Sequence, residues 1–339
     1  MSERYSRREF LEKAGKLAVV LGIAPEILSA CGPTKVNEPR FFDEIKNLPL
    51  SEQLRRVDQL YSTTPLSKEA AVNYVTPLWV GAYTQFSGSG LSQDKILSNL
   101  ALTYDISQRK ATVQEPGKVV VNPVTKTVGK IEFNFGSFES NKSIKHPEVN
   151  QSAPGIVYLR SGFAHEIGHF DTTMKEDRAL GKVINDNSIV TPKIDYPDLL
   201  VLNAFTFTGI NPDQSYTVFF DRFDEMATDV VSSYIASREN LPVIMIYPRA
   251  SYLRDMLDWV KFSSDNYLAM HRNSDLPAFA LELGRISQGM NKTTQNQDQA
   301  LIDGLRIIRI FNSGNLLQLT PYYPGIKEEI LDKPVRLVR

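Results

Sequence analysis

The sequence contains few of the residues that usually form disulfides or metal clusters, with one cysteine and four histidines among 339 residues. The single cysteine excludes an internal disulfide and a zinc site built from several thiolates. The net charge of −1 removes any electrostatic argument for nucleic acid binding. Hydrophobic residues make up 42% of the chain and charged residues 23%, and this balance is typical of a globular protein with a sizeable core.

Two of the four histidines lie in the pattern His165-Glu166-Ile167-Gly168-His169. On a helix, histidines four residues apart share one face, so both imidazoles can bind one divalent cation. The glutamate beside the first histidine can then take a proton from a metal-bound water. With so few histidines, the pattern is expected by chance in well under ~1% of chains of this length. We therefore interpret it as a metal-binding motif, with two unrelated histidines as the alternative.

The residues around this motif predict a helix with one buried face. Five apolar residues fall on one side of a helical wheel, opposite the histidines: Ile156, Leu159, Phe163, Ile167 and Phe170. Gly168 is a poor helix former, by about 1 kcal/mol relative to alanine. A close backbone approach near the metal would explain the glycine.

A third ligand is expected from a second helix, predicted over residues 216–236. A helical wheel places an apolar stripe on one face and Asp221, Glu225 and Asp229 together on the other. Three carboxylates stacked along one face repel one another, and a cation held together with the imidazoles would remove that repulsion. A solvated acidic stripe on an amphipathic helix is the alternative.

The HExxH motif followed by the sequence Glu-Met-Ala-Thr-Asp at 225–229 resembles the gluzincin branch of the zincin metallopeptidases. This resemblance implies that Zn²⁺ is bound by three side chains, namely His165, His169 and Glu225. It also implies that Glu166 acts as the general base and that Asp229 orients a histidine ligand. Asp221 remains open as an alternative ligand, with Glu225 behind it. The metzincin variant is excluded, because residues 170–172 continue as Phe-Asp-Thr without its third histidine.

The N-terminus contains two export signals in the correct order. Residues 6–13 resemble the twin-arginine signal, and residues 28–32 resemble a bacterial lipobox ending in Cys31-Gly32. The apolar stretch between them, residues 17–24, is too short to span a bilayer. Lipid on Cys31 is therefore expected to tether the protein to a membrane, on the periplasmic or surface side. Glu26 departs from the lipobox pattern, and an amphipathic helix with an incidental cysteine is the alternative.

The remaining pattern predicts an α+β protein that is predominantly helical, and the resemblance implies a zincin-like core. Strands are expected at 119–121 and 131–135, before the HExxH helix. By the zincin resemblance, the second strand is expected to line the cleft and bind extended substrate through Ile131, Phe133 and Phe135. Two ordinary core strands are the alternative.

The chain divides into five predicted segments. These are a signal at 1–30, a lipidated cysteine and tether at 31–40, an N-terminal helical region at 41–115, the catalytic core at 116–240, and a C-terminal helical region at 241–339. Helices are expected at 41–61 with a break at Pro49, at 67–86 and at 91–104. Residues 174–215, between the two metal-binding helices, are expected to be mixed loop.

These features together predict a zinc metallopeptidase, in which a glutamate activates a zinc-bound water to hydrolyse peptide or protein substrates. The enzyme would be exported by the twin-arginine route and held in the bacterial cell envelope. Two alternatives stay open: a non-catalytic zinc-binding envelope lipoprotein, and an amidase-type zinc hydrolase acting on peptidoglycan peptides. His271 could assist in the transition state if its helix faces the metal, although an isolated histidine is more often structural.

Overall fold

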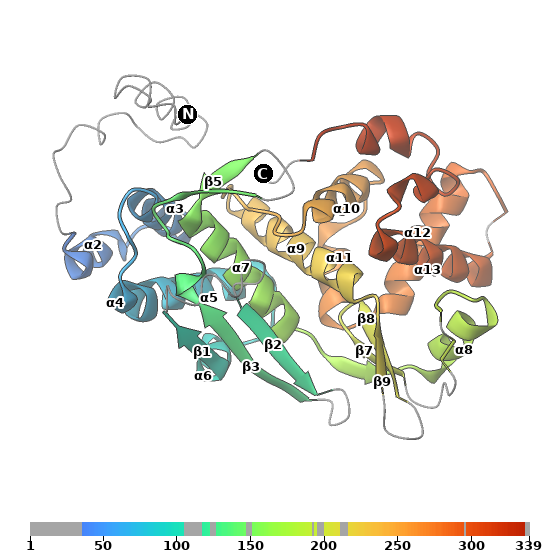
Figure 1. The fold of residues 1–339 in the computed structure, drawn as a ribbon, viewed down its shortest axis with the longest axis horizontal. Helices are drawn as coiled ribbons and strands as arrows, with labels where there is room; N and C mark the ends of the chain where they lie inside the picture. The colour runs from blue at the N-terminus through green and yellow to red at the C-terminus, as the bar shows by residue number, and fades with distance from the viewer. Residues whose placement is uncertain are drawn as a thin grey trace, which may run out of the picture.

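Two long helices lie side by side at the centre of the molecule, α7 (Gly155–Phe170) and α9 (Asp221–Arg238) (Figure 1). The computed structural model describes residues 36–104, 117–122, 127–146, 151–191, 193–194, 200–210, 216–294 and 296–335. Over these residues the fold is α+β and predominantly helical, as the sequence predicts. The twin-arginine signal, the lipobox and Cys31 lie outside the described residues.

Helices form most of the N-terminal region: α2 (Glu38–Ile45), α3 (Leu50–Tyr61), α4 (Lys68–Ala70), α5 (Thr76–Phe86) and α6 (Gln93–Asn99). The predicted break at Pro49 separates α2 from α3. One π-helical turn, Ala71–Val75, joins α4 to α5. The helix predicted over 91–104 is wrong in its second half, where strand β1 (Leu100–Thr103) follows α6 directly. Hydrogen bonding to a distant strand overrides the local helical pattern there.

A three-stranded sheet packs beside α7 and contains β1, β2 (Gly117–Asn122) and β3 (Thr127–Asn134) in the order β1-β3-β2. Strand β3 pairs in parallel with β1 and antiparallel with β2, so both edges of its backbone are occupied. A 3₁₀ turn, Phe135–Ser137, follows it.

The predicted role of β3 in substrate binding is wrong. Ile131, Phe133 and Phe135 are at most 1% exposed, and an extended peptide has no free edge of β3 to pair with. Alternation of apolar and polar residues predicts a strand with one buried face, but it does not distinguish an edge strand from a central one.

An aromatic cluster fixes α7 against this sheet. The ring of Phe163 lies 5.1 Å from that of Phe133 and 5.5 Å from that of Trp79, and Trp79 stacks on Phe135. Aromatic pairs at such distances contribute about 0.5–1.5 kcal/mol beyond the area they bury. The predicted apolar stripe of α7 is buried as expected, and the hairpin of β4 (Ser143–Lys145) and β5 (Ser152–Pro154) leads into the helix.

A second sheet separates α7 from α9 in the sequence. It is antiparallel, with β6 (Met174–Glu176), β7 (Leu200–Asn203), β8 (Thr206–Ile210) and β9 (Tyr216–Phe219) in chain order, and α8 (Arg178–Asp186) lies between its first two strands. The prediction of mixed loop over 174–215 therefore missed the regular strands and the helix that the described part of this segment forms. The predicted start of the second metal-binding helix at 216 is wrong. Tyr216–Phe219 pairs with β8, and Phe220 adopts a left-handed conformation (φ 63°) before α9 begins.

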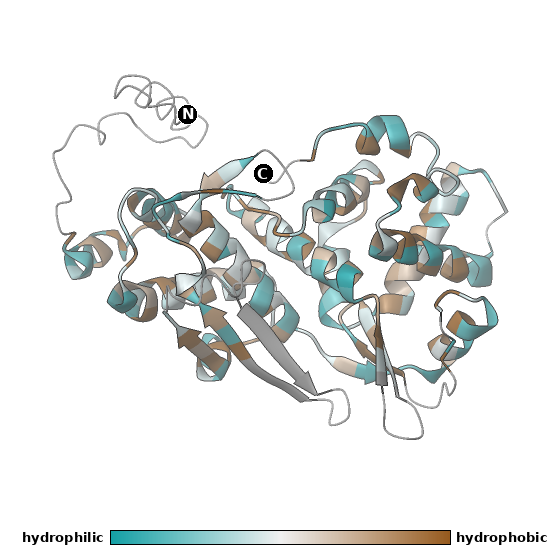
Figure 2. Ribbon diagram, viewed as in Figure 1, coloured by the Kyte–Doolittle hydropathy of each residue, from teal (hydrophilic) through white to brown (hydrophobic). Residues whose placement is uncertain are grey.

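The C-terminal region is helical, as predicted: α10 (Pro248–Trp259), α11 (Ser264–Arg272), α12 (Leu276–Met290) and α13 (Gln297–Ser313). A 3₁₀ turn, Leu316–Leu319, and a π-helical turn, Lys327–Leu331, follow. Hydrophobic and hydrophilic residues alternate along most helices (Figure 2), and the buried apolar side chains form one continuous core from Ile45 to Ile330. Among the described residues, no helix has both the length and the apolar character needed to cross a membrane.

Candidate metal centre

The two central helices approach closely where the HExxH motif lies, and Gly168 allows this approach. A Cβ atom at this position would lie 2.8 Å from Cγ2 of Thr228 and 3.8 Å from Cγ1 of Val231, both on α9. Real Cβ atoms essentially never come within 3.0 Å of another heavy atom. The glycine predicted to mark a close backbone approach therefore lies against the neighbouring helix.

Three side chains converge in the space between α7 and α9. The Nε2 atoms of His165 and His169 lie 3.1 Å apart, and Oε2 of Glu225 lies 3.0 Å and 3.5 Å from them, respectively. Three ligands of a tetrahedral ion with bonds of about 2.0–2.1 Å lie about 3.3–3.4 Å from one another. The three atoms therefore have the spacing of one face of a tetrahedral metal site, and this group could bind a metal ion.

The other ring nitrogen of His165 is held by a carboxylate. Nδ1 of His165 lies 2.9 Å from Oδ1 of Asp229, and the backbone N–H of Tyr247 donates to Oδ2 of Asp229 at 2.6 Å. The ring of Tyr247 also stacks beside the imidazole, with centroids 5.8 Å apart. A carboxylate at Nδ1 fixes that nitrogen as the proton donor and leaves Nε2 directed toward the metal position.

His169 has an equivalent partner that the sequence reasoning missed. Oδ2 of Asp224 lies 3.4 Å from Nδ1 of His169, and the backbone N–H of Phe205 donates to Oδ1 of Asp224 at 2.8 Å. Asp224 falls about 100° from Phe223 on a helical wheel, so it is not on the face that contains Asp221, Glu225 and Asp229. Only the rotation of α9 against α7 brings it to the second histidine.

Thr228 and His271 lie behind this second pair. Oγ1 of Thr228 lies 3.4 Å from Nδ1 of His169 and 3.1 Å from Nε2 of His271. His271 is 2% exposed and packs edge-on against Phe205. Burial lowers the pKa of His271 well below its ordinary value, and the nearby His169 and His165 lower it further. His271 contacts Thr228, which in turn lies beside His169.

The charges of the site depend on one another. Burial opposes protonation of His165, yet its hydrogen bonds to Asp229 and Glu225 outweigh burial and raise its pKa to about 10. Burial would raise the pKa of Glu225, but the facing His169 and His165 hold it below its ordinary value. Two imidazole nitrogens 3.1 Å apart need a shared proton or a cation between them. A divalent cation would take the place of the protons that the chain alone holds there.

The donor set fits a transition metal, because imidazole and carboxylate are ordinary ligands of Zn²⁺. The side chain of His165 is 3% exposed and that of His169 is 12% exposed, whereas that of Glu225 is 35% exposed. The site is therefore shielded on the imidazole side and reachable from the side of Glu225. Glu166 follows His165 on the same helix and is 4% exposed.

The other predicted residues lie apart from the triad. Asp221 is exposed at the first turn of α9 and does not belong to the group of potential ligands. Ile131, Phe133 and Phe135 lie in the core. Cys31 lies outside the described residues.

Comparisons with protein-family models, with curated proteins and with solved structures found no match to this chain. The function is therefore inferred from the chemistry of the site.

Proposed function

We propose that the protein is a zinc-dependent metallopeptidase. The observation that carries this proposal is the convergence of His165, His169 and Glu225, with a buried carboxylate behind each imidazole. A purely structural contact between two helices does not need two histidines oriented in this way. Three protein ligands leave the fourth position of a tetrahedral zinc ion for water or substrate, and this arrangement is typical of catalytic rather than structural zinc sites.

Each residue of the site would have one task. When bound, zinc would supply Lewis acidity, which lowers the pKa of water to about 7 and polarises a carbonyl group. Glu166 would accept a proton from the attacking water and deliver it to the nitrogen of the leaving amine. Asp229 and Asp224 would hold the two imidazoles in the tautomer that presents Nε2.

The substrate would lie along β2 in place of the buried β3. Strand β2 is at one end of the three-stranded sheet and packs beside α7. An edge strand can pair with an extended peptide through its backbone. Such pairing is largely independent of side chains and suits a peptide or protein substrate.

We further propose that lipid on Cys31 holds the enzyme in the bacterial cell envelope, after export by the twin-arginine route. The support is the order of the two signals within residues 6–32. Peptides of the envelope, including those of peptidoglycan, would then be within reach of the site.

The test is Glu166→Gln, with Glu282→Gln, a partly exposed glutamate on α12, as the matched control. The protein is loaded with zinc, and hydrolysis of a quenched fluorescent peptide library and of purified peptidoglycan is measured. Loss of hydrolysis by about 10²–10⁴-fold in Glu166→Gln, with zinc content unchanged, supports the proposal. Unchanged activity in this variant would refute it. Bound zinc without hydrolysis of either substrate by the unaltered protein would favour the non-catalytic alternative.

A further inference from the structure

A mostly apolar cavity that contains buried polar groups lies at the other end of the α7–α9 pair. This cavity, of about 40 Å³, lies between α3, α5, α7 and the end of α9, with Leu54, Trp79, Phe86 and Phe163 in its wall. Its residues on α7 all precede His165, and its residues on α9 all follow Asp229. The cavity is therefore separate from the metal centre.

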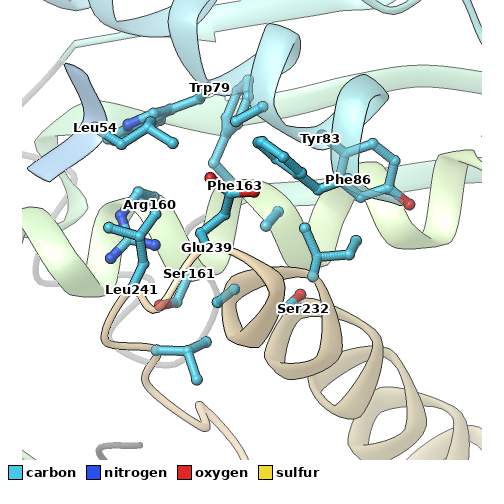
Figure 3. Close-up of a pocket in the computed structure, with 15 residues that line it drawn as sticks. Leu54, Trp79, Tyr83, Phe86, Arg160, Ser161, Phe163, Ser232, Glu239 and Leu241 are labelled. Atoms are coloured by element: carbon cyan, nitrogen blue, oxygen red, sulfur yellow. The ribbon is translucent and has the colours of Figure 1, made fainter. Parts of the chain in front are cut away.

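Two buried polar groups in this cavity have no partner among the described residues. Glu239 is 7% exposed, and neither of its carboxylate oxygens accepts a hydrogen bond. Trp79 is 3% exposed, and its indole N–H has no acceptor. Figure 3 shows the carboxyl group of Glu239 directed from the end of α9 toward α5, inside the ring of lining residues. Buried polar groups are almost always paired in folded proteins, so each exception calls for a reason.

The neighbouring cation does not satisfy Glu239. The guanidinium of Arg160 forms a two-pronged pair with Asp58, at 2.7 Å and 3.1 Å, and donates to the carbonyl oxygen of Pro242 at 2.6 Å. Burial raises the pKa of Glu239 to about 7, with Arg160 acting only to lower it. Glu239 therefore lacks a close hydrogen-bond donor.

We propose that this cavity binds a small aliphatic ammonium compound with one hydrogen-bond-accepting oxygen, of the amino alcohol class. The ammonium group would donate to Glu239, and the oxygen would accept from the indole N–H of Trp79. The aromatic rings of Trp79 and Phe163 favour a cation beside them. One water needs about 10–15 Å³ of such volume, so the cavity holds about three or four non-hydrogen atoms.

Three probes of equal size distinguish how much the ammonium contact and the oxygen contact each contribute to binding. 2-Aminoethanol has both the ammonium group and the oxygen, propan-1-amine lacks the oxygen, and ethane-1,2-diol lacks the charge. Each is titrated into the protein by calorimetry in amine-free buffer. We expect one equivalent of 2-aminoethanol to bind, with ethane-1,2-diol weaker by about 10- to 100-fold, because a charge-assisted hydrogen bond is lost. Propan-1-amine should lie between them.

Variants of both groups give a second readout. Glu239→Gln and Trp79→Phe should each weaken binding of 2-aminoethanol at least about tenfold, whereas Glu282→Gln should not. Trp259→Phe leaves Trp79 as the only tryptophan, so its fluorescence should change on binding.

Three results would overturn the proposal. The first is that no 2-aminoethanol binds at concentrations up to 100 mM, which would mean that only water fills the cavity. The second is that the uncharged diol binds as tightly as 2-aminoethanol. The third is that Glu239→Gln binds 2-aminoethanol as tightly as the unaltered protein. If a variant fails to fold, the three probes on the unaltered protein decide.

Discussion

The buried carboxylates at the two ends of the α7–α9 pair differ in whether they have hydrogen-bond partners. At the metal end, Glu225 and Asp229 face His165, Asp224 faces His169, and both aspartates also accept a backbone N–H. At the other end, both oxygens of Glu239 have no partner among the described residues. At one site, the buried polar groups thus have hydrogen-bond partners within the protein. At the other site, they have none among the described residues, so a ligand could supply them. We propose that the two ends bind two kinds of ligand. One is a metal ion, for which the donors are already arranged, and the other is a small molecule that supplies the missing hydrogen-bonding groups.

The largest expected effect comes from removing the carboxylates that support the imidazoles. Asp229→Asn and Asp224→Asn should each weaken zinc binding by about 10- to 100-fold, because the amide no longer fixes the histidine tautomer as well. Glu239→Gln is the matched change at the other end and should leave zinc affinity unchanged. Zinc dissociation constants from competition with a chelator test this contrast. Equal effects of all three changes would show that the two ends are one site.

The next largest expected effect is a loss of stability when the close contact between α7 and α9 at Gly168 is disturbed. Gly168→Ala would place Cβ 2.8 Å from Cγ2 of Thr228, so the helices must separate, at a loss of about 1–3 kcal/mol in the free energy of unfolding. Gly289→Ala, on α12, is the control, because no atom lies within 4 Å of its added Cβ, and it should stabilise by about 0.5–1 kcal/mol. Urea unfolding measures both. A stabilised Gly168→Ala protein would contradict the described contact.

Glu239 should produce the smallest effect, and it depends on pH. Its pKa of about 7 in the folded protein exceeds the ordinary value of 4.5. The unfolded chain therefore loses the proton first as pH rises, and stability falls between about pH 4.5 and 7 and then stays lower. Glu239→Gln should remove this fall. The difference in pKa sets an upper limit of about 3 kcal/mol on the gain in stability of the variant, and solvent screening should reduce this gain to about 1–2 kcal/mol by pH 8. Parallel curves for the two proteins would show that the carboxyl group is paired.

The sequence predicts one end of the helix pair far better than the other, for a physical reason. HExxH fixes the spacing of two ligands within one helix, and the carboxylates on α9 follow the same helical period, so both elements can be found from local pattern. Asp224 reaches the site because of the way α9 is rotated against α7, and Tyr247 reaches it from the loop before α10. Neither position follows from the helical period of the local sequence. Glu239 follows Arg238 at the C-terminal cap of α9, a position where a charged residue is normally solvated. Its burial depends on α3 and α5, far away in the chain.

Dependence on contacts far apart in the sequence also explains why β3 was wrongly expected to be an edge strand that binds substrate. The pattern at 131–135 correctly predicts a strand, but the position of β3 between β1 and β2 results from pairing with residues far apart in sequence. The prediction of mixed loop over 174–215 missed the strands there for a similar reason, because they are only three to five residues long and stabilise one another across the sheet.

The most direct test is metal binding by the unaltered protein, Glu225→Ala and Asp221→Ala. Both substitutions remove an acid from the same helix, but only Glu225 lies with the two imidazoles. Zinc content is measured after saturation and dialysis. We predict one equivalent in the unaltered protein and in Asp221→Ala, and strong loss in Glu225→Ala. One equivalent retained by Glu225→Ala with unchanged affinity, or no zinc in the unaltered protein, would contradict the metal centre.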